Sequence, residues 1–197
     1  MSDIRIGHPA DNIFYTHATL SETFTAEECD AIISLGLQKL EQAKIASGEV
    51  ENKTRSSKVN FLFPSEETKW IFERIKEVTD NVNDRLFNFD LVYFPNMQFT
   101  SYSVGDYYDW HMDLIPGGKN QPFTRKLSLS VVLSDPLEYE GGELEVNRYA
   151  DDSCEIALKP KQGTVVFFPS FIQHRVTKVT KGSRYSLVIW VEGDRFK

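Results

Sequence analysis

Apolar residues in the first half of the chain recur with the period of an α-helix in two segments. The first segment follows a T-x-x-E capping box formed by Thr25 and Glu28. Its apolar positions are Cys29, Ile32, Ile33, Leu37 and Leu40. The second segment follows Pro64 and is expected to begin at Ser65. Its apolar face would carry Ile71, Ile75, Val78, Val82 and Leu86. Between the two helices, residues 47–58 are polar and predict a mobile loop, followed by a short strand at 59–63.

The second half of the chain alternates short β-rich runs with turn residues and shows no helical period. Strands are expected at residues 97–103, 127–133, 144–147, 155–158, 164–168, 173–177 and 184–191. This spacing predicts a jelly roll, that is, a double-stranded β-helix of the cupin-like kind. The N-terminal helices would pack on one of its sheets. We therefore expect one α+β domain over residues 1–197, helical at about 20–90 and with its jelly-roll core at about 91–197.

Charge and cysteine content narrow the possible partners and the compartment. The chain carries 22 Lys and Arg against 29 Asp and Glu, a net charge of −7, which disfavours nucleic acid and anionic membranes as partners. Cys29 and Cys154 are far apart in the sequence and predict buried thiols in a reducing compartment. The first twelve residues contain no apolar leader segment, so a cytoplasmic location is expected.

The candidate chemistry lies at two of the four histidines. His8 and His17 fall in the polar N-terminal segment and are expected to be solvated or locally bonded. His111 precedes Asp113 by two residues, so on an extended strand both side chains point to one face. His174 follows a predicted strand and supplies a second imidazole. Two imidazoles and one carboxylate form the facial triad that binds non-haem Fe(II) and leaves coordination positions open. A zinc site would accept the same ligands, but the H-E-x-x-H helix of zinc peptidases is missing.

Arg184 lies ten residues after His174, on the last predicted strand. Alternation along that strand puts Arg184, Ser186, Val188 and Trp190 on one face and Tyr185, Leu187, Ile189 and Val191 on the other. A guanidinium inside a barrel is costly unless it is paired, and the carboxylate of a bound ligand would pair it well. The alternative is an exposed arginine at a strand start, beside Gly182.

Several motifs in order resemble a known family. Tyr102-Ser-Val-Gly105-Asp-Tyr-Tyr108-Asp-Trp-His111-Met-Asp113 resembles the Y-x-x-G-x-x-Y-x-x-H-x-D motif of prolyl 4-hydroxylase-type Fe(II)/2-oxoglutarate dioxygenases. The segments around Gly141-Gly142-Glu143-Leu144 and from His174 to Arg184 are similar to the bacterial PKHD-type hydroxylases of that superfamily. The resemblance runs from about residue 97 to 191. A shorter segment, Thr54-Arg55-Ser56-Ser57, resembles the R-T-S segment that lies in a loop over the substrate of prolyl 4-hydroxylases.

The resemblance implies roles for particular residues. His111, Asp113 and His174 would be the iron ligands. Arg184, assisted by Ser186 and Tyr102, would bind the distal carboxylate of 2-oxoglutarate. Residues on the substrate side would be Arg55, Ser57, Arg125 and Trp190. Related halogenases have a small residue in place of the aspartate, so Asp113 favours hydroxylation.

The implied activity is that of a procollagen-proline 4-dioxygenase-like hydroxylase. It would consume 2-oxoglutarate and O₂, produce succinate and CO₂, and act on a proline residue in a peptide or protein, with ascorbate as a further cofactor. The first alternative is a free amino acid or another small molecule hydroxylated with the same cofactors. Nucleic-acid demethylation of the AlkB kind is disfavoured by the net charge and by Trp190, which stands where that family places a second arginine. A cupin-like module that binds metal without turnover is the remaining alternative. The oligomeric state is left open by the sequence.

Overall fold

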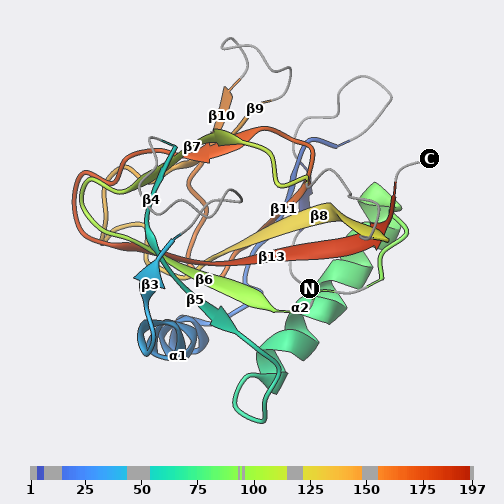
Figure 1. Ribbon diagram of the computed structural model, residues 1–197, viewed down its shortest axis with the longest axis horizontal. Coiled ribbons are helices and arrows are strands. Elements are labelled where there is room, and N and C mark those ends of the chain that lie inside the picture. The colour runs from blue at the N-terminus through green and yellow to red at the C-terminus, as the bar shows by residue number, and fades with distance from the viewer. Residues whose placement is uncertain are drawn as a thin grey trace.

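Two β-sheets stack face to face, and two helices cover the outer side of the larger sheet (Figure 1). The computed structural model describes residues 4–6, 15–43, 54–92, 94, 96–114, 122–147 and 155–195. Its helices are α1 (Ala26–Leu37), α2 (Lys69–Val82) and the π-helix η1 (Asn83–Phe87). The strands are β1 (Ile4–Ile6), β2 (Ala18–Leu20), β3 (Glu41–Gln42), β4 (Arg55–Ser56), β5 (Lys58–Leu62), β6 (Met97–Tyr102), β7 (Tyr107–His111), β8 (Phe123–Val132), β9 (Leu144–Asn147), β10 (Glu155–Leu158), β11 (Val165–Pro169), β12 (His174–Val176) and β13 (Arg184–Asp194).

The strand order is that of a jelly roll, as the sequence predicts. The larger sheet has the order β1-β2-β11-β8-β13-β6-β5-β3 and the smaller one β10-β9-β12-β7-β4. Neighbouring strands are antiparallel in both sheets. From β6 to β13, consecutive strands fall in different sheets except for β9 and β10, so the chain crosses repeatedly between the two layers. Residues far apart in sequence therefore meet in the space between the sheets.

Helix α1 begins at the predicted capping box and lies close against the larger sheet. The Thr25 hydroxyl accepts a hydrogen bond from the Glu28 backbone N–H, and the Glu28 carboxylate accepts one from the Thr25 N–H. Close approach is possible because Gly36 has no side chain: a Cβ there would lie 2.2 Å from the ring of Phe99 on β6. The expected apolar face is right for Cys29 and Ile32 but wrong for Leu37, which is 43% exposed at the helix end.

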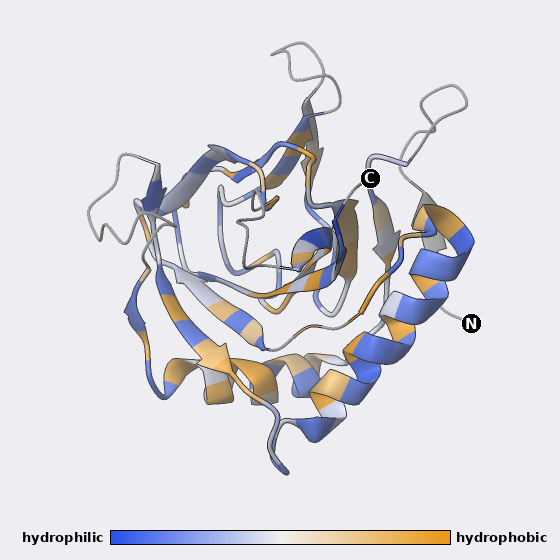
Figure 2. Ribbon diagram, turned by 45° about the vertical axis from the view of Figure 1, so that its right-hand side comes forward, coloured by the Kyte–Doolittle hydropathy of each residue, from blue (hydrophilic) through white to orange (hydrophobic). Residues whose placement is uncertain are grey.

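Helix α2 begins at Lys69, four residues later than expected. Ser65 and Thr68 exchange backbone-to-side-chain hydrogen bonds, so the residues before the helix form a turn that cannot be told from a helix start by sequence. Within the helix, Ile71 and Ile75 are completely buried, and Figure 2 shows its hydrophilic and hydrophobic residues in alternating stripes. The helix continues into η1, which Asn88 ends in the left-handed conformation with φ 53°.

Strand β13 divides its side chains between two layers. Tyr185, Leu187, Ile189 and Val191 pack with residues of α1 and α2 into the main apolar cluster. Arg184, Ser186, Val188 and Trp190 line a pocket on the other face, between the sheets. This is the alternation predicted from the sequence, and it results from the two-residue period of a strand.

Some expectations about loops and strands need correction. Residues 55–58 belong to β4, the start of β5 and their junction, and not to a loop, because β4 pairs with β7 and β5 with β6. Strands β1, β2, β3, β4 and β7 have no counterpart among the strands expected from sequence. Most of the rest of the expected 47–58 loop, His8 and Cys154 lie outside the described residues. Within the described ranges, no helix is long and apolar enough to cross a membrane.

Candidate active site

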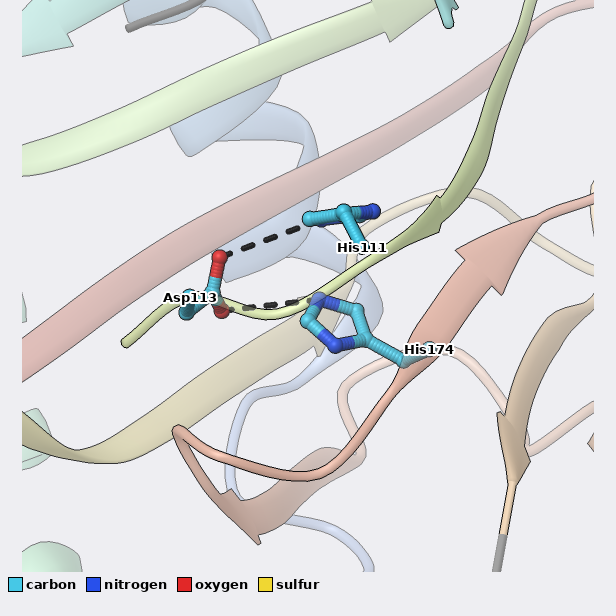
Figure 3. A group of neighbouring side chains, drawn as sticks. All are labelled: His111, Asp113 and His174. Atoms are coloured by element: carbon cyan, nitrogen blue, oxygen red, sulfur yellow. Dashed lines mark ion pairs between the residues drawn. The ribbon is translucent and has the colours of Figure 1, made fainter. Parts of the chain in front are cut away.

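Two paired strands of the smaller sheet bring the histidines together. Strand β7 pairs with β12 in a register that sets His111 opposite His174, and their ring centroids are 4.1 Å apart. Asp113 lies two residues beyond the end of β7, and its backbone N–H donates to the Ser170 carbonyl at 2.9 Å. This bond attaches the end of the β7 segment to the turn between β11 and β12. The three side chains converge as the sequence predicts (Figure 3).

The donor atoms of the triad form a compact set. The Nε2 atom of His111 lies 3.8 Å from Oδ1 of Asp113, and Nε2 of His174 lies 3.5 Å from Oδ2 of the same carboxylate. One ligand atom from each residue lies within 4.8 Å of the others. Two imidazole nitrogens and a carboxylate on one side of a point are the donors of the facial triad that binds Fe(II). The residues present therefore fit a divalent transition metal.

Backbone carbonyls fix the tautomer of both imidazoles. The Nδ1 atom of His111 lies 2.8 Å from the Asp109 carbonyl, and that of His174 lies 3.0 Å from the Ile172 carbonyl. A carbonyl can only accept, so each Nδ1 carries the proton. In the neutral rings the lone pair is then on Nε2, the atom that faces Asp113. Each histidine is thus oriented by the carbonyl of the residue two positions before it.

Burial sets the charge of the triad at neutral pH. Burial, followed by repulsion from His174, lowers the pKa of His111 to about 3, against the opposing attraction of Asp113. Burial alone would raise the pKa of Asp113, but the two imidazoles and the Ser128 hydroxyl together hold it below its ordinary value. His111 is therefore neutral and Asp113 is ionised, which is the state that binds a metal cation.

Two serines support the carboxylate. Ser128 on β8 donates its hydroxyl to Oδ2 of Asp113 at 2.8 Å, and the Ser170 hydroxyl lies 2.9 Å from that of Ser128. Both serines are completely buried. The strand pattern Leu127-Ser-Leu-Ser-Val131 already placed polar residues in an otherwise apolar strand, which is the signal that could have identified Ser128. Ser128 was not among the site residues predicted from the sequence.

A buried arginine shares the pocket with the triad. Arg184 is 2% exposed, its Nη1 donates to Ser186 Oγ at 3.2 Å, and its guanidinium lies 5.4 Å from the centre of the Tyr102 ring. Tyr102 on β6 is its cross-strand partner. Within the described part of the chain, no carboxylate forms an ion pair with Arg184. A buried guanidinium of this kind is suited to an anionic ligand.

Gly142 makes room for the stem of Arg184. A Cβ at Gly142 would lie 2.9 Å from Cδ of Arg184 and 3.1 Å from Cγ2 of Val179. The backbone φ of Gly142 is +67°, so the position also disfavours side chains conformationally. Gly142, the second glycine of the Gly-Gly-Glu-Leu segment, therefore determines where the guanidinium of Arg184 can lie.

The other predicted site residues surround the triad. Arg55 on β4 lies over the Tyr108 ring at 4.6 Å, and that ring stacks on His111 with centroids 3.5 Å apart. Ser57 accepts a hydrogen bond from Nε of Arg55 at 2.8 Å. Arg125 lies 3.9 Å over the ring of Trp190. Arg55, Tyr108 and Trp190 line the pocket. Ser57 and Arg125 do not line it but contact lining residues, Ser57 through Arg55 and Arg125 through Trp190.

The surroundings of Tyr108 and His17 go beyond what the sequence predicts. Tyr108 belongs to the recognised motif, but its place between Arg55 and His111 depends on the pairing of β4 with β7, which no local pattern indicates. His17 was expected to be solvated or locally bonded; it is locally bonded, with its Nδ1 3.3 Å from the Thr16 hydroxyl, and it is buried. Burial lowers the pKa of His17 as well.

Comparison with known proteins agrees with this geometry. The sequence profile of the 2OG-Fe(II) oxygenase superfamily matches residues 97–192. A PKHD-type hydroxylase of Pseudomonas aeruginosa strain LESB58 is 31% identical over 183 residues, 86% of this chain and 75% of that protein. A PKHD-type hydroxylase of Janthinobacterium is 39% identical over 104 residues, which span 51% of this chain but only 44% of the relative. The chain therefore belongs to the PKHD-type hydroxylases of the 2OG-Fe(II) oxygenase superfamily.

Solved structures show the same fold. The crystal structure of a Pseudomonas putida prolyl-4-hydroxylase superimposes with a TM-score of 0.72 and 18% identity, covering 91% of this chain and 94% of that one. A prolyl hydroxylase from Trichoplax adhaerens, in complex with a peptide fragment of the oxygen degradation domain of hypoxia inducible factor, gives a TM-score of 0.71 and 17% identity, over 89% of this chain and 83% of that one.

The hydrogen bond from Ser128 to Asp113 should contribute to metal affinity. We expect Ser128→Ala to weaken Mn(II) binding about 10- to 100-fold, because the carboxylate loses the partner that orients it. Isothermal titration calorimetry measures this change. Ser101→Ala is the matched control, since Ser101 is a buried serine on β6, two strands away from β8 in the same sheet, and its cross-strand partner is Tyr185, on the helix-facing side. Equal affinities of Ser128→Ala and Ser101→Ala would contradict the role of Ser128.

The metal-free protein should lose stability on acidification. His111 has its pKa lowered to about 3 in the folded state and near 6.5 when unfolded, so the unfolded chain binds more protons between these values. The free energy of unfolding should therefore fall as the pH drops from 6.5 towards 3, by at most about 1.4 kcal/mol per pH unit for this group. Urea unfolding of wild type and His111→Gln across this range tests it. The variant should show a smaller slope, although not zero, because His17 contributes in the same direction. Equal slopes would refute the assignment.

Proposed function

We propose that the protein is an Fe(II)- and 2-oxoglutarate-dependent dioxygenase that hydroxylates a proline residue in a peptide or protein. The observation that carries this proposal is the buried guanidinium of Arg184 in the same pocket as the His111, Asp113 and His174 triad. A metal-binding module without turnover needs the triad but gains nothing from a buried cation beside it. A co-substrate with a free carboxylate accounts for both features.

The residues of the pocket divide into two groups in this proposal. His111, Asp113 and His174 would hold the metal through two neutral imidazoles and one carboxylate. When bound, the iron supplies the activation of O₂ that organic side chains cannot provide. Arg184 would bind the distal carboxylate of 2-oxoglutarate, with the Ser186 hydroxyl and the Tyr102 side chain beside it. The net reaction converts substrate C–H, 2-oxoglutarate and O₂ into substrate C–OH, succinate and CO₂.

The chain itself contributes orientation and a dry pocket. The carbonyls of Asp109 and Ile172 hold both imidazoles in the metal-binding tautomer before any ligand arrives. Leu144, Phe168 and Val176 line the pocket with apolar surface, which excludes water from the reacting groups. Asp113 would supply the third protein ligand of the metal. Its carboxylate would take the coordination position that a halide occupies in related halogenases, so hydroxylation is favoured.

The substrate side of the pocket supports a peptide. Arg55, Ser57, Arg125 and Trp190 surround the triad with cationic and aromatic groups that can contact a chain laid across the pocket. Two proteins of the same fold are named as prolyl hydroxylases, and one of them is complexed with a peptide fragment. These likenesses support a proline-containing peptide or protein as the substrate. We further propose one catalytic domain over residues 1–197, ascorbate as a supporting reductant, and a cytoplasmic location.

The activity can be tested directly. Purified protein with Fe(II) and 2-oxoglutarate should form succinate faster when proline-containing peptides are added, and those peptides should gain 16 Da by mass spectrometry. Arg184→Ala should raise the KM for 2-oxoglutarate about 10- to 100-fold, because a charge-assisted carboxylate pair is lost, while Mn(II) affinity is kept. Succinate formation stimulated by free proline and not by peptides would support the small-molecule alternative. Unchanged KM in Arg184→Ala would contradict the co-substrate assignment.

Gly142 should affect co-substrate binding through Arg184. In Gly142→Ala the new methyl group meets Cδ of Arg184, so the guanidinium must shift and the KM for 2-oxoglutarate should rise about 10-fold. Gly105→Ala is the matched control, because its φ is +94° but a Cβ there meets nothing within 4 Å. Both variants carry backbone strain, and only Gly142→Ala displaces the arginine. A similar KM in the two variants would show that the contact with Arg184 is unimportant.

A further inference from the structure

The pocket contains a second buried guanidinium that the binding of 2-oxoglutarate does not use. Arg55 is 8% exposed, and its Nε donates to Ser57 Oγ at 2.8 Å. Its remaining interaction is with the ring of Tyr108. Among the described residues no carboxylate forms an ion pair with it. A charge removed from water without a counter-charge is costly, so its retention in the pocket needs an explanation.

The position of Arg55 places it on the opposite side of the pocket from Arg184. Arg55 lies on β4 of the smaller sheet, paired directly with Tyr108 of β7. Arg184 lies on β13 of the larger sheet. The Tyr108 ring is 4.6 Å from the Arg55 guanidinium and 3.5 Å from the His111 ring, so Arg55 adjoins the triad from its own side. One dicarboxylate that bridges Arg184 and the metal therefore leaves Arg55 unpaired.

The charges of the pocket lining also favour an anionic ligand. In the described part of the chain, Asp113 is the one carboxylate that lines the pocket, and it already faces both histidines. Arg55 and Arg184 are the cationic residues of that lining. This local excess of positive charge occurs in a protein of net charge −7, so it does not follow from overall composition. Such an excess attracts anions into the pocket.

The geometry of Arg55 is suited to a carboxylate. The bond to Ser57 occupies Nε, which leaves the two terminal nitrogens as the free fork of the guanidinium. The contact with the Tyr108 ring and the bond to Ser57 together restrict how the fork can turn. Two parallel N–H donors in a fixed plane match the two oxygens of a carboxylate. A neutral peptide group offers one carbonyl oxygen and no charge, so it would satisfy this cation less well.

We propose that the substrate itself carries a carboxylate close to the hydroxylated carbon, and that Arg55 binds it. This rests on the proposed function, because it assumes that Arg184 takes the co-substrate. Two kinds of substrate present this chemistry: a peptide with an acidic residue beside the target proline, and a free amino acid with its α-carboxylate. Arg55 then selects substrates by charge, whereas the metal centre and Arg184 act on all of them alike.

Paired probes that differ in one charge test this proposal. The peptide pair is acetyl-Ala-Pro-Asp-Ala-amide and acetyl-Ala-Pro-Asn-Ala-amide, and the amino-acid pair is L-proline and L-prolinamide. Each is titrated into protein loaded with Mn(II) and 2-oxoglutarate, and affinity is measured by calorimetry, so turnover is not needed. In at least one pair the anionic member should bind about 10- to 100-fold more tightly to the wild type. The pair that shows the preference identifies the source of the carboxylate.

Variants connect the preference to Arg55. Arg55→Gln should abolish the preference, and Arg55→Lys should keep part of it, because the charge remains without the planar fork. Lys58→Gln is the matched control: it removes one positive charge from the exposed start of β5 and should keep the preference. Equal or undetectable binding of both members of both pairs to the wild type would overturn the proposal, as would a preference that persists in Arg55→Gln.

The outcome can be separated from failure of the proposed function. If the wild type binds neither Mn(II) nor 2-oxoglutarate in the same calorimeter, the proposed function fails. If it binds both, but shows no preference for the anionic probes, only the role of Arg55 fails. Melting curves of the Arg55 variants in Mn(II) confirm that they are folded before the comparison is made.

Discussion

The register between β7 and β12 is the constraint on which the rest of the site depends. It sets His111 opposite His174 and leaves Asp113 just past the strand end, where Ser170 holds its backbone. Side chains alternate with a period of two along a strand, so a slip of one residue would turn one imidazole away from the other. The carbonyl bonds to each Nδ1, the Ser128 hydroxyl and the Tyr108 stack all act on donors that this register has already placed.

Charge inside the pocket is the second organising feature. Burial keeps His111 neutral, and the neighbouring imidazoles and the Ser128 hydroxyl hold the pKa of Asp113 below its ordinary value, so this carboxylate is ionised. The two sheets then each add a guanidinium, Arg184 from β13 and Arg55 from β4. Within the described chain, no carboxylate forms an ion pair with either guanidinium. An unpaired buried guanidinium costs free energy, and under the proposed function that cost is offset when each arginine binds an anion.

Much of this could be predicted from the sequence, but only where a local pattern carries the information. Local sequence features carry three parts of the site: the H-x-D spacing, the second histidine and the alternation around Arg184. The structure brings these residues together. Strand β4 has two residues and is held by its partner β7, so its own sequence gives no signal. The start of α2 was placed too early because Ser65 and Thr68 bond as a helix cap would. Ser128 gains its role from Asp113, fifteen positions away on a different element.

Strand β13 has a consequence for how such an enzyme can change over generations. Its odd-numbered side chains fill the main core and its even-numbered ones line the pocket. Neighbours such as Leu187 and Ser186 therefore share one stretch of backbone, although one packs in the core and the other lines the pocket. A substitution that repacks the core must shift that backbone and with it the groups beside the co-substrate. Drift in the core is therefore freer in α2, which packs against β13 but contributes no residue to the pocket lining, than along β13 itself. New substrate ranges should arise most readily from the smaller sheet, where Arg55 can be exchanged without disturbing the apolar cluster under the helices.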